Sequence, residues 1–110
     1  MIQTNVQTIE DAFSTLGREE RVRVITHGAA FRLSDLRNRL ILAQSKIEHF
    51  QAKYQKSLED IERDGLPDDA DYEMHEDYIF WHHWSEAAQK AGHEIERLEQ
   101  IAQFGLHLEN

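Results

Sequence analysis

The sequence predicts an all-α fold built on one long antiparallel helical hairpin, preceded by a short helix or strand segment. Two apolar seams with alternating spacings of 3 and 4 residues predict two amphipathic helices that pack in the manner of a coiled coil. A short turn that holds the only proline separates the two seams. The composition agrees with this fold, because β-branched residues are few, and 110 residues suit a single domain over 1–110 with a modest core.

The first seam predicts a helix over residues 29–63. It consists of Leu33, Leu36, Leu40, Ala43, Ile47, Phe50 and Tyr54, followed after a shift of one residue by Leu58 and Ile61. Gly65 accepts the left-handed conformation that commonly follows a helix, and Pro67 cannot continue one. Both residues therefore predict that the helix ends shortly before them.

The second seam predicts another helix of similar length over residues 71–104. It consists of Met74, Tyr78, Trp81, Trp84, Ala88, Ala91, Ile95, Leu98 and Ala102. Residues 64–71 contain four Asp and the only Pro, which predicts a hairpin loop whose carboxylates favour the start of the next helix. Gly105 marks the predicted end of this helix.

Two helices of equal length joined by a short loop lie antiparallel, so residues whose numbers add up to about 135 should face each other. The predicted facing groups are Phe50 and Tyr54 with Trp81 and Trp84, Leu40 with Ile95, and Arg37 and Arg39 with Glu96 and Glu99.

The first 28 residues allow two interpretations. A short helix over residues 8–16, ended by Gly17, is one of them, and the alternating sequence of residues 21–25 as a strand is the other. Residues 78–81 are apolar around the whole helix circumference, whereas a hairpin buries only one face. Either the N-terminal residues or a second copy of the chain must cover them, and we expect a homodimer.

The charge distribution favours a basic protein as the binding partner. Residues 1–56 carry nine Lys or Arg and six Asp or Glu, whereas residues 57–110 carry three and fifteen. Such an excess of acid repels nucleic acid and attracts basic proteins. The only basic cluster is all arginine, and we expect it to pair with carboxylates of this chain or of a partner rather than with phosphate. Its members are Arg18, Arg21, Arg23, Arg32, Arg37 and Arg39.

The sequence offers no signal for catalysis, a cofactor or a metal. There is no cysteine, no glycine-rich phosphate loop and no nucleophile elbow, and a hairpin of this size offers little concavity in which to desolvate a catalytic group. Asp71 with His75 and His82, or His83 with Glu86, lie at helical spacing, but neither set forms a recognisable ligand motif. We expect no enzyme activity, no cofactor and no metal.

We expect the chain to remain in the cytoplasm and to bind its partner through the second helix. It has no apolar run of about 18 residues for a membrane span and no N-terminal signal segment. Aromatic side chains are frequent in binding hot spots, although the same run also suits a core, and acidic side chains would attract a basic partner. The predicted partner-binding residues are Tyr78, Phe80, Trp81, Trp84, Glu96 and Glu99.

Residues 46–100 resemble a family of small helical antitoxins from bacterial and archaeal toxin–antitoxin modules, the partners of TumE-like toxins. The resemblance lies in FQAKY at 50–54, SLEDI at 57–61, LPDD at 66–69, HEDY at 75–78 and WHHW at 81–84. It implies a protein antitoxin that neutralises a small basic toxin by direct binding. The first 45 residues have no counterpart in the family, and a self-associating structural or adaptor hairpin is the alternative.

Overall fold

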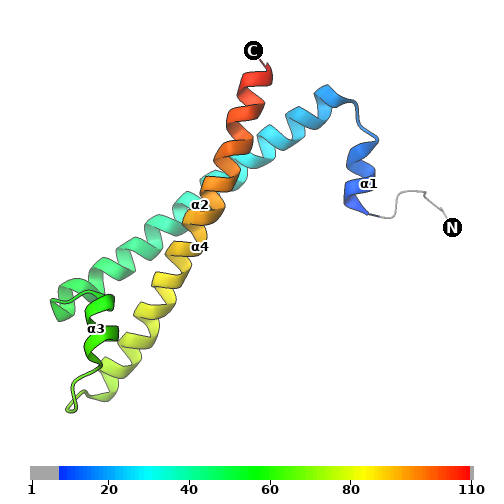
Figure 1. The fold of residues 1–110 in the computed structure, drawn as a ribbon. Helices are drawn as coiled ribbons and strands as arrows, with labels where there is room; N and C mark the ends of the chain where they lie inside the picture. Colours follow the sequence, from blue (N-terminus) through cyan, green and yellow to red (C-terminus); the bar gives the residue numbers. More distant parts are fainter. Residues whose placement is uncertain (1–7, 110) are drawn as a thin grey trace. The chain divides into compact units, whose positions relative to one another are not determined.

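A computed structural model of the chain describes residues 8–109 (Figure 1). These residues form four helices and no strand: α1 (Ile9–Ser14), α2 (Arg18–Tyr54), α3 (Leu58–Asp64) and α4 (Tyr72–Glu109). The two long helices, α2 and α4, pack against each other as a hairpin, and the short helix α1 precedes them. The predicted all-α hairpin is therefore confirmed.

The chain divides into two compact units. One unit is the continuous segment Ser34–Ile95, and the other combines the residues up to Leu33 with those from Glu96 onward.

The core of the Ser34–Ile95 unit forms around the buried side chains of Phe50, Ile61 and Trp81. The Trp81 ring stacks on Phe50 at a centroid distance of 5.8 Å and on Tyr54 at 6.1 Å. This contact confirms the predicted facing of Phe50 and Tyr54 with Trp81. Further half-buried residues pack against the three: Ile47, Tyr54, Leu58, Leu66, Met74, Tyr78 and Trp84.

The first long helix breaks at residues 55–57, where the sequence predicted a continuous helix to residue 63. Gln55 has φ 56°, a left-handed conformation that ends α2. Ser57 then starts α3 with a capping box, in which its side chain accepts from Asp60 N at 3.1 Å and its own N–H donates to Asp60 Oδ2 at 3.2 Å. The break falls where the first seam shifts by one residue between Tyr54 and Leu58.

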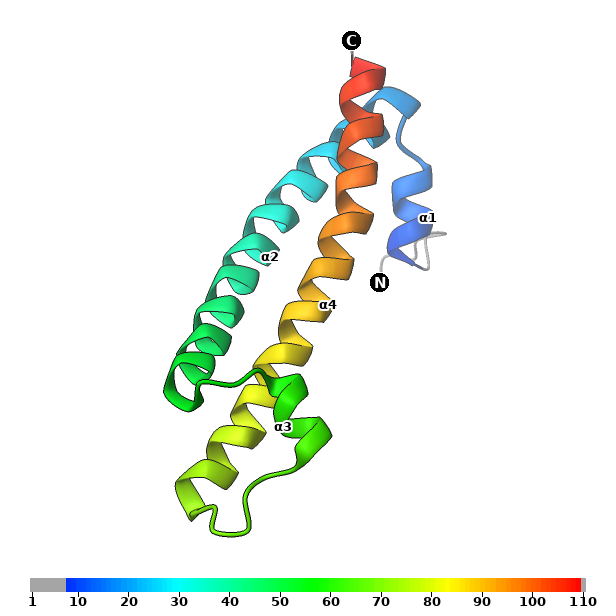
Figure 2. The ribbon, with the colours of Figure 1, turned by 60° about the vertical axis from the view of Figure 1, so that its left-hand side comes forward.

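The separate helix α3 covers a second side of α4 (Figure 2). Ile61 and Leu58, both from α3, belong to the core cluster that contains Trp81. The expectation that only N-terminal residues or a second copy can cover residues 78–81 is therefore wrong for Tyr78 and Trp81, because α3 supplies part of the cover. Ile79 and Phe80 remain 64% and 54% exposed.

The turn between α3 and α4 ends the helix at the predicted glycine, but not in the predicted conformation. Gly65 has φ 78° and ψ 168°, a positive φ outside the left-handed helical region, and its N–H donates to the carbonyl of Ile61 at 2.7 Å, which closes α3. Asp71 accepts from the N–H of Met74 at 2.9 Å and so caps the first turn of α4. Helix α4 continues to Glu109, beyond the predicted end at 104, since one glycine inside a long helix costs only about 1 kcal/mol.

The other unit contains α1 and the first turns of α2. Thr8 caps α1, with its side chain accepting from Asp11 N at 3.0 Å, so the N-terminal helix prediction is confirmed. The alternative strand over 21–25 is wrong, because these residues lie inside α2. Half-buried Val22 and buried Thr26, Ala29 and Leu33 extend the first seam towards the N-terminus at spacings of 4, 3 and 4, so α2 begins at Arg18 rather than at 29.

Candidate functional site

The structure divides the predicted aromatic binding residues between core and surface. Trp81 is 1% exposed and lies in the core, so the prediction that it contacts a partner does not fit its burial. Tyr78 and Trp84 are half-buried and pack against the same core. Phe80, in contrast, is 54% exposed and available for binding.

Phe80 forms an apolar face on α4 together with Tyr72 and Ile79. These three side chains are 76% (Tyr72), 64% (Ile79) and 54% (Phe80) exposed. Tyr72 and Ile79 are seven residues apart, which places them two turns apart on one side of the helix, away from the seam. We call these three residues the apolar face of α4. An exposed set of this size on one helix is a typical protein-binding feature.

The apolar face lies on a helix with a large excess of acid. Helix α4 contains eight Asp or Glu and two Lys or Arg. Glu76 accepts a hydrogen bond of 2.7 Å from the Tyr72 hydroxyl, so one carboxylate is held directly beside the face. Of the predicted acidic binding residues, Glu96 is exposed and Glu99 is half-buried, and both belong to the other unit, so they are not part of this face.

Asp77 connects α4 to the end of α2. Its Oδ2 lies 2.6 Å from Lys53 Nζ and also accepts a hydrogen bond from the Tyr54 hydroxyl. Partial burial raises the pKa of Asp77, but the hydrogen bonds from Lys53 and Tyr54 lower it by more. The same cluster raises the pKa of Lys53, mainly through its hydrogen bonds to Asp77 and Glu73, and burial raises the pKa of Tyr54. This cluster holds the closed end of the hairpin together.

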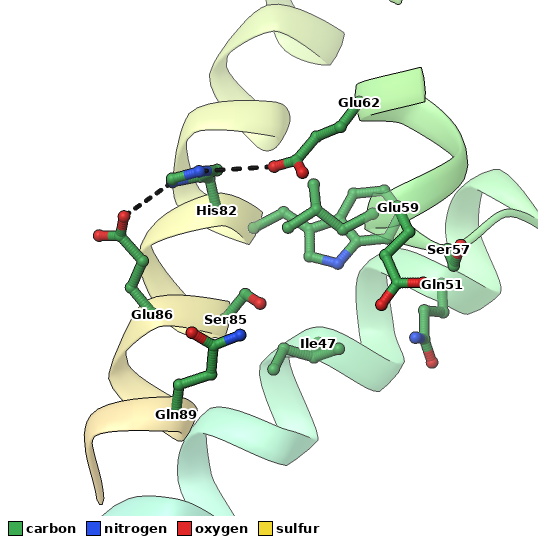
Figure 3. Close-up of a pocket in the computed structure, with 11 residues that line it drawn as sticks. Ile47, Gln51, Ser57, Glu59, Glu62, His82, Ser85, Glu86 and Gln89 are labelled. Atoms are coloured by element: carbon green, nitrogen blue, oxygen red, sulfur yellow. Dashed lines mark ion pairs between the residues drawn. The ribbon is translucent and has the colours of Figure 1, made fainter. Parts of the chain in front are cut away.

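A pocket of about 370 Å³ lies where α2, α3 and α4 meet (Figure 3). Its apolar lining comes from Ile47, Leu58 and Trp81. Its polar lining consists of Gln51, Ser57, Glu59, Glu62, His82, Ser85, Glu86 and Gln89. Three of these residues are glutamates and none is Lys or Arg, so the pocket has an acidic lining.

Two nitrogen-containing side chains of this pocket, the imidazole of His82 and the indole of Trp81, bear on what it can bind. His82 lies between two carboxylates, with Nε2 3.4 Å from Glu62 Oε1 and Nδ1 3.5 Å from Glu86 Oε1 (Figure 3). The indole nitrogen of Trp81 is buried and has no hydrogen-bond partner among the described residues. An unmet buried donor of this kind costs about 1–3 kcal/mol, so an acceptor brought to it would be favourable.

Asp71, His75 and His82, the candidate set of three from the sequence, do not form a metal site. Among the side chains of residues 8–104, no group of three or more His, Asp or Glu is arranged to hold a metal ion. None of the helices in the same part of the chain combines the length and hydrophobicity needed to cross a membrane.

The sequence indicated Ile79 only as one of the apolar residues 78–81, and it did not indicate Tyr72 or the pocket. A signal for Tyr72 with Ile79 was present, since these two residues share the helix side opposite Trp81 and are large and apolar. The pocket had no such signal, because it exists only once α3 separates from α2 and turns towards α4.

Comparisons of the chain with profiles of known protein families, with curated proteins and with solved structures found no match. The resemblance to small antitoxins therefore rests on the sequence of residues 46–100 alone.

Proposed function

We propose that this chain is a protein-binding module that neutralises a small basic protein, the toxin of a toxin–antitoxin pair, by direct contact through α4. The observation that carries the proposal is the apolar face of α4 on a strongly acidic helix. Apolar contacts in the centre with charges around them are the usual anatomy of a protein interface. The acidic surroundings select a basic partner and accelerate its encounter, an effect that fades as salt screens the charges.

The partner to test is the product of a small basic reading frame adjoining the gene for this chain. If that product arrests growth when expressed alone, co-expression of this chain should restore growth. The purified pair should bind more weakly at high salt than at low salt, and Phe80→Ala should weaken binding by about tenfold, as expected for an aromatic hot spot. Phe31→Ala is the matched control, because Phe31 is 81% exposed but lies on α2.

Growth that stays arrested in the presence of this chain would contradict the antitoxin proposal. Binding that is equal at both salt concentrations and unaffected by Phe80→Ala would contradict the use of α4. A charge reversal at Glu96 and Glu99, which lie in the other unit, separately tests whether these two predicted residues contribute.

Self-association is the second candidate function, and a face of α2 favours it. Ile41 and Leu42 are 63% and 50% exposed on a helix side that holds no Asp, Glu, Lys or Arg. This uncharged face consists of exposed residues that share one side of α2 at helical spacing: Ser34, Asn38, Ile41, Leu42, Ser45, His49 and Ala52. Two copies with a net charge of −9 each repel one another least where neither carries a charge.

We therefore expect a homodimer in isolation that forms through the uncharged face of α2. Light scattering should give twice the mass of 12.9 kDa for the natural chain and the monomer mass for Ile41→Glu. Phe80→Glu should leave the dimer intact, because Phe80 lies on α4. A monomeric natural chain would rule out self-association as its function.

A further inference from the structure

We propose that the acidic pocket between α2, α3 and α4 binds an arginine side chain of the partner together with a main-chain carbonyl beside it. This inference rests on the proposed function for the source of the arginine, since it assigns the arginine to the basic protein that the chain binds. It adds a specific anchor point to that interaction, distinct from the apolar face of α4.

The charge of the pocket selects a cation. Glu59 and Glu62 enter it from α3 and Glu86 enters it from α4, with no basic side chain among the lining residues. The carboxylates of Glu62 and Glu86 both approach His82, within 3.4 and 3.5 Å of its two nitrogens. Carboxylates from two helices thus converge on one planar group with nitrogens on opposite sides. A guanidinium presents the same kind of planar, multiply donating group, and it remains charged throughout the physiological pH range.

The buried indole of Trp81 indicates, independently of the charge, that the bound group also supplies a hydrogen-bond acceptor. Its Nε1 donor has no acceptor among the described residues, although the residue lines the pocket and is 1% exposed. A simple cation cannot satisfy this donor, because ammonium and guanidinium groups carry donors only. A peptide with arginine can, because the carbonyl oxygens of its main chain are acceptors. A ligand that combines a positive charge with a hydrogen-bond acceptor fits the pocket best, and this favours an arginine within a protein chain over a free cation.

The size of the pocket fits one side chain rather than a cofactor. Its volume of about 370 Å³ lies at the lower end of the range of about 300–1,000 Å³ found for ligand pockets. The apolar side chains of Ile47, Leu58 and Trp81 line it as well, and they suit the three methylene groups of an arginine.

The test uses N-acetyl-arginine N-methylamide, which carries the guanidinium and two carbonyl groups, and follows the indole N–H signal of Trp81 by two-dimensional NMR. Trp84→Phe leaves Trp81 as the only indole and assigns the signal. We expect the Trp81 signal to shift in a saturable manner with this compound and not with its neutral citrulline counterpart. Glu62→Gln should weaken binding by roughly fivefold, whereas Asp68→Asn, which changes the net charge equally but lies in the exposed turn, should not.

Three results would overturn the proposal: no shift with the arginine compound, an equal shift with the citrulline compound, or an equal effect of Glu62→Gln and Asp68→Asn. An equal shift of Trp81 with guanidinium chloride would assign the pocket to small cations and overturn the peptide source. The titration needs no toxin, so its failure would leave binding at the apolar face of α4 intact. Conversely, if the chain binds the arginine compound but not the basic protein encoded by the adjoining reading frame, only the proposed function is contradicted.

Discussion

At the scale of single residues, Asp77 is the most connected side chain at the closed end of the hairpin. It is 17% exposed and joins Lys53 and Tyr54 of α2 to α4. Exposed ion pairs contribute little to stability, but this carboxylate is mostly removed from water and accepts two hydrogen bonds from different residues. Its lowered pKa means that the folded state favours the ionised form more than the unfolded state does.

The first prediction concerns the pH dependence that follows from Asp77. Asp77→Asn should lower the free energy of unfolding by about 1 kcal/mol at pH 7. A carboxyl group with a lowered folded-state pKa stabilises the fold above its unfolded pKa of about 3.9, and this contribution is lost as the pH falls further. The difference between natural chain and variant should therefore shrink below about pH 4. Urea unfolding followed by circular dichroism at pH 7 and pH 3 measures it.

Glu73→Gln is the control for that series. Glu73 also contacts Lys53, at 2.7 Å, but its side chain is 69% exposed. We expect a change within about 0.5 kcal/mol for this substitution. Equal losses for the two variants would show that Asp77 has no special role.

At the scale of secondary-structure elements, the break between α2 and α3 determines how the hairpin closes. The sequence predicted the seam residues on both sides of the break correctly, since Phe50, Tyr54, Leu58 and Ile61 are all buried or half-buried. It did not predict the break, because Gln55 gives no sign of its left-handed conformation. Ser57 and Asp60 form a capping box in which aspartate replaces the usual glutamate. The sequence signal for a helix start at Ser57 was therefore weak.

The second prediction tests the strain at this break. Gln55→Gly should stabilise the chain by up to about 1 kcal/mol. The left-handed conformation costs a non-glycine residue about 1–2 kcal/mol, and glycine avoids this cost. Part of the stabilisation is lost again, because glycine has a larger conformational entropy in the unfolded chain. An exposed glutamine inside α2 gives the matched control, Gln44→Gly, which should destabilise by about 1 kcal/mol. Scanning calorimetry would show melting temperatures that move in opposite directions, and a fall in both would refute a strained Gln55.

At the scale of the whole molecule, the two halves of the chain carry opposite net charges, and Lys53 joins them through ion pairs with Glu73 and Asp77. Arg23 pairs with Glu19 and Glu20, Arg39 with Asp35, and Arg63 with Asp60 and Asp64, in each case within one helix. The sequence predicted that the basic half would meet the acidic half. Four acidic side chains of α4 are exposed, Glu73, Glu76, Glu86 and Glu96, and this supports a basic partner.

The third prediction is that folding requires no metal. The seven histidines include His82, which contacts Glu62 and Glu86. Among the side chains of residues 8–104, however, no three donors are arranged to hold an ion. Dialysis against a chelator should leave the melting temperature unchanged, since structural metal sites contribute strongly to folding where they exist. A marked fall that zinc reverses would contradict this.

Both tryptophans of the chain, Trp81 and Trp84, lie in the Ser34–Ile95 unit. Tryptophan fluorescence is therefore an optical reporter of that unit alone, while the far-ultraviolet signal sums the helices of both. The other unit buries only Thr26, Ala29 and Leu33 among its described side chains, so it should lose helix first. We expect part of the helical signal to disappear at urea concentrations where the fluorescence is still native. Coincident curves would instead mean that the two units unfold as one cooperative body.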